Sequence, residues 1–370
     1  MRKRGLGLLL SGCILLSCLT ACGGGGGSSS SRGSASLPEE PSVSVIAPVP
    51  EPEPEPEPVA YPYTNPLTGE GLEEDIGARR PIAIMLNNLE KALPQLGVSQ
   101  ADVIYEIVAE GGITRMMALF QDVEGVGDLG SVRSARDYYV SLANGHDAIY
   151  VHAGGSDQAY ISIKNWGVTA IDFVNGPYGN MCWRDQDRRK NAGLEHSLLT
   201  SSEKLLEQMP SRFRQEHEEG FQVGWTFSEE APAGGQAAGT LTVPFSSYKT
   251  GHFTYDADQG GYLIRQHING HDRDYVDGNT DQDVVVSNVL VLYTDISAVK
   301  GDTAGRQSVR TTGSGEGLLL RDGQLYPITW ERESRSDRLS FLDGSGQPIP
   351  LAVGHSYINI VSRSADVTWS

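Results

Sequence analysis

Charged residues that could do chemistry gather between residues 105 and 152. They fall at the ends of predicted strands or at a predicted helix start, and they are Glu106, Glu110, Arg115, Arg133, Arg136, Asp137 and His152. Ligands of α/β proteins collect at the carboxyl ends of the strands. Arginine forks bind carboxylate and phosphate groups through paired hydrogen bonds. This stretch is therefore the candidate ligand site.

Within it, Ser131–Arg136 has the pattern of an anion-binding turn. We expect a glycine turn, then unpaired backbone N–H groups at a helix start, with two arginines beside them. The predicted ligand-binding residues are Arg115, Arg133, Ser134, Arg136 and His152. The ligand would carry a phosphate or carboxylate, on an envelope metabolite or polymer. In the alternative, the arginines pair internally with Glu106, Glu110 or Asp137 and orient the loops.

Two carboxylates allow an enzymatic alternative. Glu106 and Glu110 could serve as the acid and base of an envelope hydrolase, with the arginines as anchors. Such a pair works only at a suitable separation and with a raised pKa, and the sequence shows neither. His152 is followed by Ser156, but no G-x-S-x-G elbow and no third triad member accompany them. Binding is the favoured interpretation, and catalysis stays the alternative.

Cofactor and metal patterns are weak. Gly125–Gly130 matches G-x-G-x-x-G, but Gln121–Glu124 separate it from the preceding strand. The sequence contains no H-E-x-x-H, no C-x-x-C and no P-loop. The acidic run Asp272–Asp283 departs from the EF-hand spacing, because Gln282 stands where the turn glycine is needed. We therefore expect no cofactor and no metal.

Predicted strands and helices, which would position these residues, alternate between residues 65 and 212. This alternation predicts an α/β domain with a mixed or partly parallel sheet. The predicted strands are Pro81–Leu86, Val103–Val108, Met116–Phe120, Ala148–His152 and Ala170–Val174. The predicted helices are Ser134–Ala143, Ser156–Trp166 and Thr200–Met209, with serines as caps of the first two and a Thr200/Glu203 capping box on the third.

From residue 221 to 365 the helix patterns stop, which predicts a mainly antiparallel all-β domain and an α+β fold overall. Asp322-Gly323 between two strands is the strongest hairpin signal. The predicted strands are Phe221–Phe227, Gly239–Phe245, His252–Tyr255, Gly261–Gln266, Val284–Thr294, Gly317–Arg321, Gln324–Thr329, Arg338–Phe341 and Tyr357–Val361.

The first residues predict an exported, lipid-anchored protein. Three cations and the apolar stretch Leu6–Leu19 are typical of a signal peptide over residues 1–21, and the stretch is short for a membrane span. Leu19-Thr20-Ala21-Cys22 resembles a bacterial lipobox, which makes Cys22 the predicted lipidation site. Residues 22–61 are rich in Gly, Ser, Pro and Glu and predict an unfolded spacer.

The charge and the cysteine content of the chain restrict the classes of partner and cross-link that we expect. The formal net charge is −18, and loss of the three signal-peptide cations would make it −21. Such a chain repels polyanions, so we expect no nucleic acid. Cys182 alone would remain free, so no intramolecular disulfide is expected. The expected partners are the membrane, through the lipid on the extracytoplasmic face, and an envelope protein or an anionic ligand.

Several blocks resemble the YerB-like bacterial lipoproteins, which carry paired N- and C-terminal domains of unknown function (DUF3048). In the first half the blocks are Asn65–Gly69, Arg80–Ala83, Gln100–Asp102 with Tyr105-Glu106, Glu110–Arg115, Val132–Arg136 and Val151–Gly155. In the second half they are Val243–Ser246, His252–Tyr255, Asn288–Val291, Thr312–Gly317 and Ile328–Trp330. The resemblance implies the two-part organisation and an envelope location, and it brings no activity with it.

Overall fold

The structure is a computed structural model that describes residues 60–222 and 224–370. The predicted signal peptide, the predicted lipidation site Cys22 and the predicted spacer up to residue 59 lie outside the described residues.

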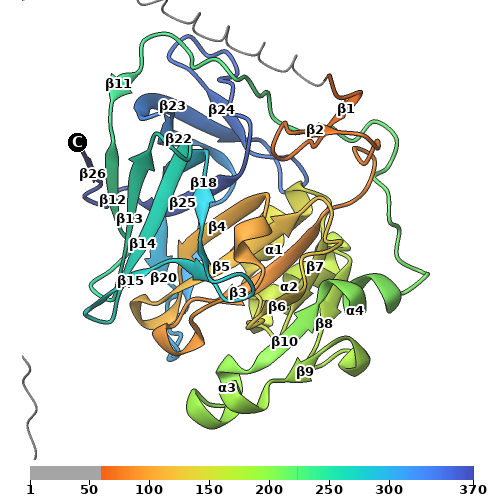
Figure 1. Cartoon of the computed structure of the whole chain (residues 1–370). Coiled ribbons are helices and arrows are strands. Elements are labelled where there is room, and N and C mark those ends of the chain that lie inside the picture. The colour runs from red at the N-terminus through yellow and green to blue at the C-terminus, as the bar shows by residue number, and fades with distance from the viewer. Residues whose placement is uncertain (1–59, 223) are drawn as a thin grey trace, which may run out of the picture. The chain divides into compact units, whose positions relative to one another are not determined.

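An 11-stranded mixed sheet runs through the body and takes strands from both halves of the sequence. Its order is β11-β23-β22-β19-β25-β4-β5-β3-β7-β8, and β24 pairs with β23. In Figure 1 the strands that continue the sheet from the orange strands of the first half, such as β22, β23 and β25, are blue, whereas the blue-green strands belong to the second sheet described below. From the first half come β3 (Ile82–Asn87), β4 (Val103–Val108), β5 (Thr114–Phe120), β7 (Ile149–His152) and β8 (Ala170–Asp172). From the second half come β11 (Gln236–Ala237), β19 (Asn288–Thr294), β22 (Gly313–Arg321), β23 (Gln324–Arg332), β24 (Ser340–Leu342) and β25 (Ser356–Ser362).

The two halves of the sequence meet at β25. This strand lies between β4 and β19 and runs parallel to both, with Tyr357 opposite Ile104 on one side and Val289 on the other. Strands β3, β7 and β8 are also parallel to one another, whereas β3–β5, β4–β5, β19–β22 and β22–β23 are antiparallel. The predicted partly parallel sheet in the first half is therefore confirmed.

A second, antiparallel sheet belongs to the second half, which confirms the α+β fold class. It contains β12 (Thr240–Pro244), β13 (Lys249–Asp256), β14 (Gly261–Ile268), β15 (His271–Asp274), β18 (Val285–Val286) and β26 (Thr368–Trp369). A small sheet joins β6 (Asp128–Gly130), β9 (Trp183–Arg184) and β10 (Leu198–Ser201). The remaining pairs are β1 (Tyr63–Thr64) with β2 (Gly71–Leu72), β16 (Val276–Asp277) with β17 (Gln282–Asp283), and β20 (Ile296–Ala298) with β21 (Gln307–Val309).

The α-helices of the described residues all precede residue 208, as the sequence predicted. They are α1 (Asp137–Gly145), α2 (Asp157–Trp166), α3 (Gln186–Asn191) and α4 (Ser202–Glu207), and the 3-10 turns are η1 (Glu90–Ala92), η2 (Val98–Gln100), η3 (Glu110–Gly112), η4 (Gly179–Met181) and η5 (Leu194–His196). Ser156 caps α2, because its hydroxyl accepts the Ala159 N–H.

Two predicted helix starts were wrong. α1 begins at Asp137, and its N-cap Arg136 makes no side-chain cap, so Ser134 is not the capping residue. α4 is capped by Ser201, which accepts the Lys204 N–H. The Thr200 hydroxyl instead donates to the Met181 carbonyl at 2.7 Å, which anchors β10 to the preceding segment.

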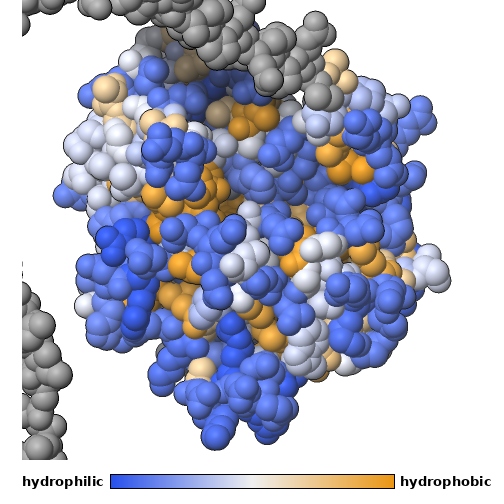
Figure 2. All heavy atoms as spheres, in the orientation of Figure 1, coloured by the Kyte–Doolittle hydropathy of each residue, from blue (hydrophilic) through white to orange (hydrophobic). Residues whose placement is uncertain are grey.

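Each face of the large sheet buries its own core, because alternate residues of a strand point to opposite faces. Along β3, Ala83 and Met85 pack with the aromatic side chains of α1, whereas Ile82, Ile84 and Leu86 pack toward the antiparallel sheet. Both cores contain residues from both halves of the sequence. In the orientation of Figure 2, polar side chains cover most of the surface and apolar ones form separate patches.

The predicted hairpin at Asp322-Gly323 is confirmed. Arg321 pairs with Gln324 across a two-residue turn, and both turn residues have positive φ, 53° and 68°. The strand predicted over Phe221–Phe227 was wrong: its described residues form no strand, and Phe227 makes a single bridge to Leu351. Trp225 and Phe227 instead pack against a core, and Trp225 Nε1 donates to the Leu339 carbonyl at 2.7 Å.

Candidate functional site

A pocket of about 590 Å³ lies at the carboxyl ends of the parallel strands β7 and β8. Ala153 directly follows β7, and Val174 follows β8 by two residues. Other lining residues come from η5 and from the two residues between α3 and η5. The lining residues are Val132, Arg133, Ser134, Ala153, Gly154, Val174, Arg184, Ala192, Gly193, Leu194 and Glu195. The pocket thus lies at the position where α/β sheets bind ligands.

Two arginines and one serine give the pocket its polar groups. Arg133 bonds the Glu195 carboxylate at 2.7 Å. Arg184 donates to the Leu194 carbonyl at 2.5 Å and has no carboxylate partner among the residues that the structure describes. Neither the amide nor the hydroxyl of Ser134 has a hydrogen-bond partner there. Donors from two segments, the turn at residues 133 and 134 and the strand β9, therefore line one pocket.

The other backbone N–H groups of the predicted anion-binding turn form hydrogen bonds within the protein. The N–H groups of Val132, Arg133 and Ala135 donate to the carbonyls of Leu198, Met85 and Gly154 respectively. These bonds hold the turn between β10, β3 and the loop after β7. In this turn a ligand can therefore be bound by the Ser134 amide and hydroxyl and by the Arg133 side chain. The row of unpaired N–H groups that the sequence suggested is not present in this turn.

Arg115 and Arg136 share the carboxylate of Glu110. Arg115 Nη2 lies 3.3 Å from both Glu110 oxygens. The Arg115 and Arg136 side chains are only 4% and 9% exposed, and the Glu110 side chain is 18% exposed. Burial lowers the pKa of both arginines from the ordinary value, although arginine keeps its proton at neutral pH. Arg115 and Arg136 therefore pair internally with a carboxylate, as the alternative prediction from the sequence had it.

Some guanidinium nitrogens of this cluster stay unbonded. Nε of Arg115, Arg133 and Arg136 and Nη1 of Arg115 are buried without a partner among the described residues. Burial lowers the pKa of Arg133, and the nearby charge of Arg115 lowers it further. Buried donors of this kind are uncommon in folded proteins. The arginines therefore form a positive cluster that two carboxylates, Glu110 and Glu195, neutralise only in part.

His152 lies beneath the pocket rather than in its lining. Its side chain is 1% exposed, and Nδ1 lies 2.9 Å from the Gly154 carbonyl. Burial lowers its pKa, so the ring is neutral, and the Gly154 bond places the proton on Nδ1. Asp172 accepts from the N–H groups of Gly154 and Val174. His152 and Asp172 therefore shape the loop that forms the pocket wall.

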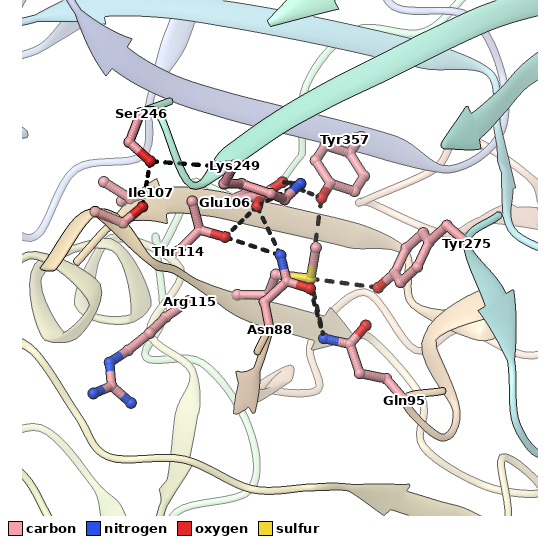
Figure 3. A network of polar contacts seen from close by, with 12 residues as sticks. Asn88, Gln95, Glu106, Ile107, Thr114, Arg115, Ser246, Lys249, Tyr275 and Tyr357 are labelled. Carbon is pink, nitrogen blue, oxygen red and sulfur yellow. Dashed lines mark hydrogen bonds and ion pairs between the residues drawn. The ribbon is translucent and has the colours of Figure 1, made fainter. Parts of the chain in front are cut away.

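Glu106 is fully buried, at 0% exposure, at the centre of a polar network (Figure 3). Lys249 Nζ lies 3.0 Å from Oε1, and Tyr357 donates to Oε2 at 2.6 Å. Thr114 and Asn88 donate to Oε1 at 2.5 and 2.8 Å. Arg115 points away from this network. Glu106 and Glu110 therefore occupy different surroundings, and the Glu106 carboxylate is shielded from solvent, whereas the Glu110 side chain is 18% exposed.

Three important residues were missed by the sequence interpretation. Arg184 lines the pocket, Glu195 pairs with Arg133, and Lys249 pairs with Glu106. Glu195-His196, which forms the end of η5, was a visible pair of ionisable residues that could have directed attention to this side of the pocket. Lys249 gave no such signal, because it stands 143 residues from its partner.

Residues 60–222 and 224–370 contain no helix that is long and apolar enough to cross a membrane. Over the same residues, no group of three or more His, Cys, Asp or Glu side chains is arranged to hold a metal ion. Asp277 in the acidic run is buried, and its carboxylate accepts from the N–H groups of Gly97 and Ser99.

The chain belongs to the DUF3048 family of proteins of unknown function. Its N-terminal domain model matches residues 67–217, and its C-terminal domain model matches residues 241–358. The curated relative "Putative lipoprotein YerB" of Bacillus subtilis (strain 168) is 30% identical over 299 residues, which cover 80% of this chain and 85% of that protein. The crystal structure of YerB from Bacillus subtilis matches with a TM-score of 0.70 and 26% identity, over 83% of this chain and 99% of the other.

Proposed function

We propose that this chain is a lipid-anchored protein of the extracytoplasmic membrane face that binds a small anionic ligand, through a carboxylate or phosphate group. The ligand occupies the pocket formed by Arg133, Ser134 and Arg184. One observation carries the proposal: Arg184, which has no carboxylate partner among the described residues, faces the same pocket as Arg133 and the unbonded Ser134.

The charge of this pocket is opposite to that of the chain. Its lining holds two arginines and one glutamate, whereas the whole chain has a formal net charge of −18. A local positive site in a negative protein draws small anions and repels polyanions. Planar guanidinium forks suit carboxylate and phosphate, and a serine hydroxyl and amide add two donors.

The pocket also has an apolar edge. Val174 and Leu194 line it and are 53% and 56% exposed. Apolar walls with a few convergent polar groups are typical of small-molecule sites. The favoured ligand is therefore an organic anion whose apolar part lies against these two side chains.

Inorganic phosphate and acetate are suitable probes of the anionic group. We expect either anion to raise the melting temperature of the protein relative to chloride at equal ionic strength, because a ligand of the native state stabilises it. Arg184→Gln should weaken binding about tenfold or more, since a hydrogen bond to a charged group contributes about 1.5–3 kcal/mol.

Arg189→Gln is the matched control. Arg189 lies on the neighbouring helix α3, is exposed and does not line the pocket, yet the substitution removes the same charge. Loss of the anion effect in Arg184→Gln and Ser134→Ala, but not in Arg189→Gln, supports the pocket. An equal anion effect in all the variants rejects it.

The anchor is tested separately, because it concerns residues that the structure does not describe. The similarity to a protein named as a lipoprotein supports lipid at Cys22. Cys22→Ala should remove labelling by a fatty-acid analogue and shift the protein out of the membrane fraction. Continued lipid labelling of Cys22→Ala would contradict the anchor without affecting the pocket.

A further inference from the structure

The network around Glu106 holds a primary amine and a carboxamide against one carboxylate oxygen. Lys249 Nζ lies 3.0 Å from Glu106 Oε1, and Asn88 Nδ2 donates to the same oxygen at 2.8 Å. The lysine, the glutamate and the asparagine are 1%, 0% and 1% exposed. Figure 3 shows the lysine and the asparagine pointing toward the glutamate from different elements.

The elements that supply these groups pack tightly. Asn88 directly follows β3, Glu106 lies in β4, and Lys249 is the first residue of β13 in the other sheet. The Lys249 amine also lies 5.5 Å from the centre of the Phe245 ring. The site therefore excludes water, and all three groups are held in place by the fold.

Burial changes the chemistry of the lysine. It lowers the pKa of Lys249, although the Glu106 charge opposes the shift. One proton passed from the amine to the carboxylate would remove both charges from the interior, where charge is costly. The transfer would leave a neutral amine, which is a nucleophile, next to a carboxylic acid, which is a proton donor.

We propose that Lys249 and Asn88 condense to an intramolecular isopeptide bond, with Glu106 as the proton carrier. The amine attacks Cγ of Asn88, and the new Nζ–Cγ bond forms as the Cγ–Nδ2 bond breaks. The Nδ2 group leaves as ammonia after taking one proton from Glu106, which recovers a proton from the Lys249 nitrogen. No oxidant or reductant is needed, and Glu106 ends unchanged.

Neighbouring donors support this reaction. Thr114 donates to Glu106 Oε1 at 2.5 Å, and Tyr357 donates to Oε2 at 2.6 Å, so the carboxyl group is fixed in orientation. Asn88 Nδ2 also donates to Thr114 Oγ1 at 2.9 Å, which places the leaving nitrogen beside the acid. Preorganised groups of this kind accelerate a reaction through proximity alone.

The bond would join the two segments that the family models match, 67–217 and 241–358. It would also connect the large sheet to the antiparallel sheet. Among the described residues Cys182 is the single cysteine, so no disulfide can serve this purpose there. A cross-link that closes a long loop restricts the unfolded chain and stabilises the native state.

Mass spectrometry of the full-length chain tests the proposal directly. A tryptic digest should contain a branched peptide that joins Arg80–Lys91 to Gln215–Arg265, lighter by one ammonia than the two chains with the Lys249–Thr250 bond uncut. Most of the purified protein should carry this linkage. A wild-type digest with separate peptides, cleaved after Lys249, overturns the proposal.

Variants separate the chemistry from folding. Glu106→Gln keeps the shape of the side chain but cannot carry the proton, so the branched peptide should disappear. Asn88→Ala should also abolish it. Asn65→Ala is the matched control, since Asn65 is a buried asparagine bonded to the Asp102 carboxylate. A branched peptide that persists in Glu106→Gln contradicts the role of Glu106.

Discussion

Replacing Glu110 by glutamine should destabilise the protein far more than the same change at Glu195. Glu110 neutralises two arginines whose side chains are 4% and 9% exposed, and it is itself 18% exposed. Removing one partner of a buried ion pair costs about 3–5 kcal/mol, because the other charge stays buried. We expect about 3 kcal/mol for Glu110→Gln, at the lower end because Glu110 is partly hydrated.

Glu195 provides the comparison. It pairs with Arg133 at 2.7 Å, but its side chain is 56% exposed, and an exposed pair contributes about 1 kcal/mol or less. Glu195→Gln should therefore leave stability almost unchanged. It should also strengthen anion binding in the pocket, because Arg133 loses its internal carboxylate.

The free energy of unfolding of both variants can be measured by urea denaturation, with tryptophan fluorescence as the signal. The midpoint of Glu110→Gln should fall clearly at an unchanged slope, which identifies a change in stability. Equal midpoints for the two variants would refute the argument, since Glu110 would then not be neutralising buried charge. The result also concerns the alternative that the protein is a hydrolase. A loss of hydrolase activity in Glu110→Gln would indicate a catalytic role only if this variant remains folded.

Two further predictions concern pH and a turn. Burial raises the pKa of Asp102 from 3.8 to about 6, so its contribution to stability is complete below about pH 4 and is lost as the pH rises through about 6. The pKa shift corresponds to about 3 kcal/mol of folding free energy. Asp102→Asn should therefore flatten the plot of unfolding free energy against pH between about pH 4 and 6. A slope equal to that of the wild type would contradict the raised pKa of Asp102. Gly323→Ala should lower stability by about 1–3 kcal/mol, because a residue other than glycine is strained at φ 68°. Its Cβ would also meet the Tyr255 ring at 3.0 Å, and a melting temperature equal to that of the wild type would disprove this.

Much of the local structure could be predicted from the sequence. β4 has the predicted bounds, and β3, β7, β19 and β25 differ from theirs by a few residues, because alternating or continuous apolar runs mark buried strands. The turn at Asp322-Gly323 followed from the two residues that tolerate positive φ. Helix starts were less certain, since a serine near a helix pattern can bond elsewhere, as the missed start of α1 shows.

Long-range pairing could not be predicted. Nothing local to Tyr357 indicates that its strand lies between β4 and β19. The same limit applies to the candidate site: Arg133 and Ser134 were found because they stand in a turn at a predicted helix start, but Arg184 comes from a separate small sheet. Glu106 looked like a free acid in sequence because its lysine lies 143 residues away.

The position of β25 has a consequence for the order of assembly. Of all the strands in the large sheet, residues 356–362 are synthesised last, yet they fill the gap between β4 and β19. Until they leave the ribosome, two partial sheets expose unpaired edges that invite association with other chains. The large sheet therefore stays open until residues 356–362 are made. This delay suits the export that we propose for the protein, because a body that closed early could not pass through a narrow translocation channel.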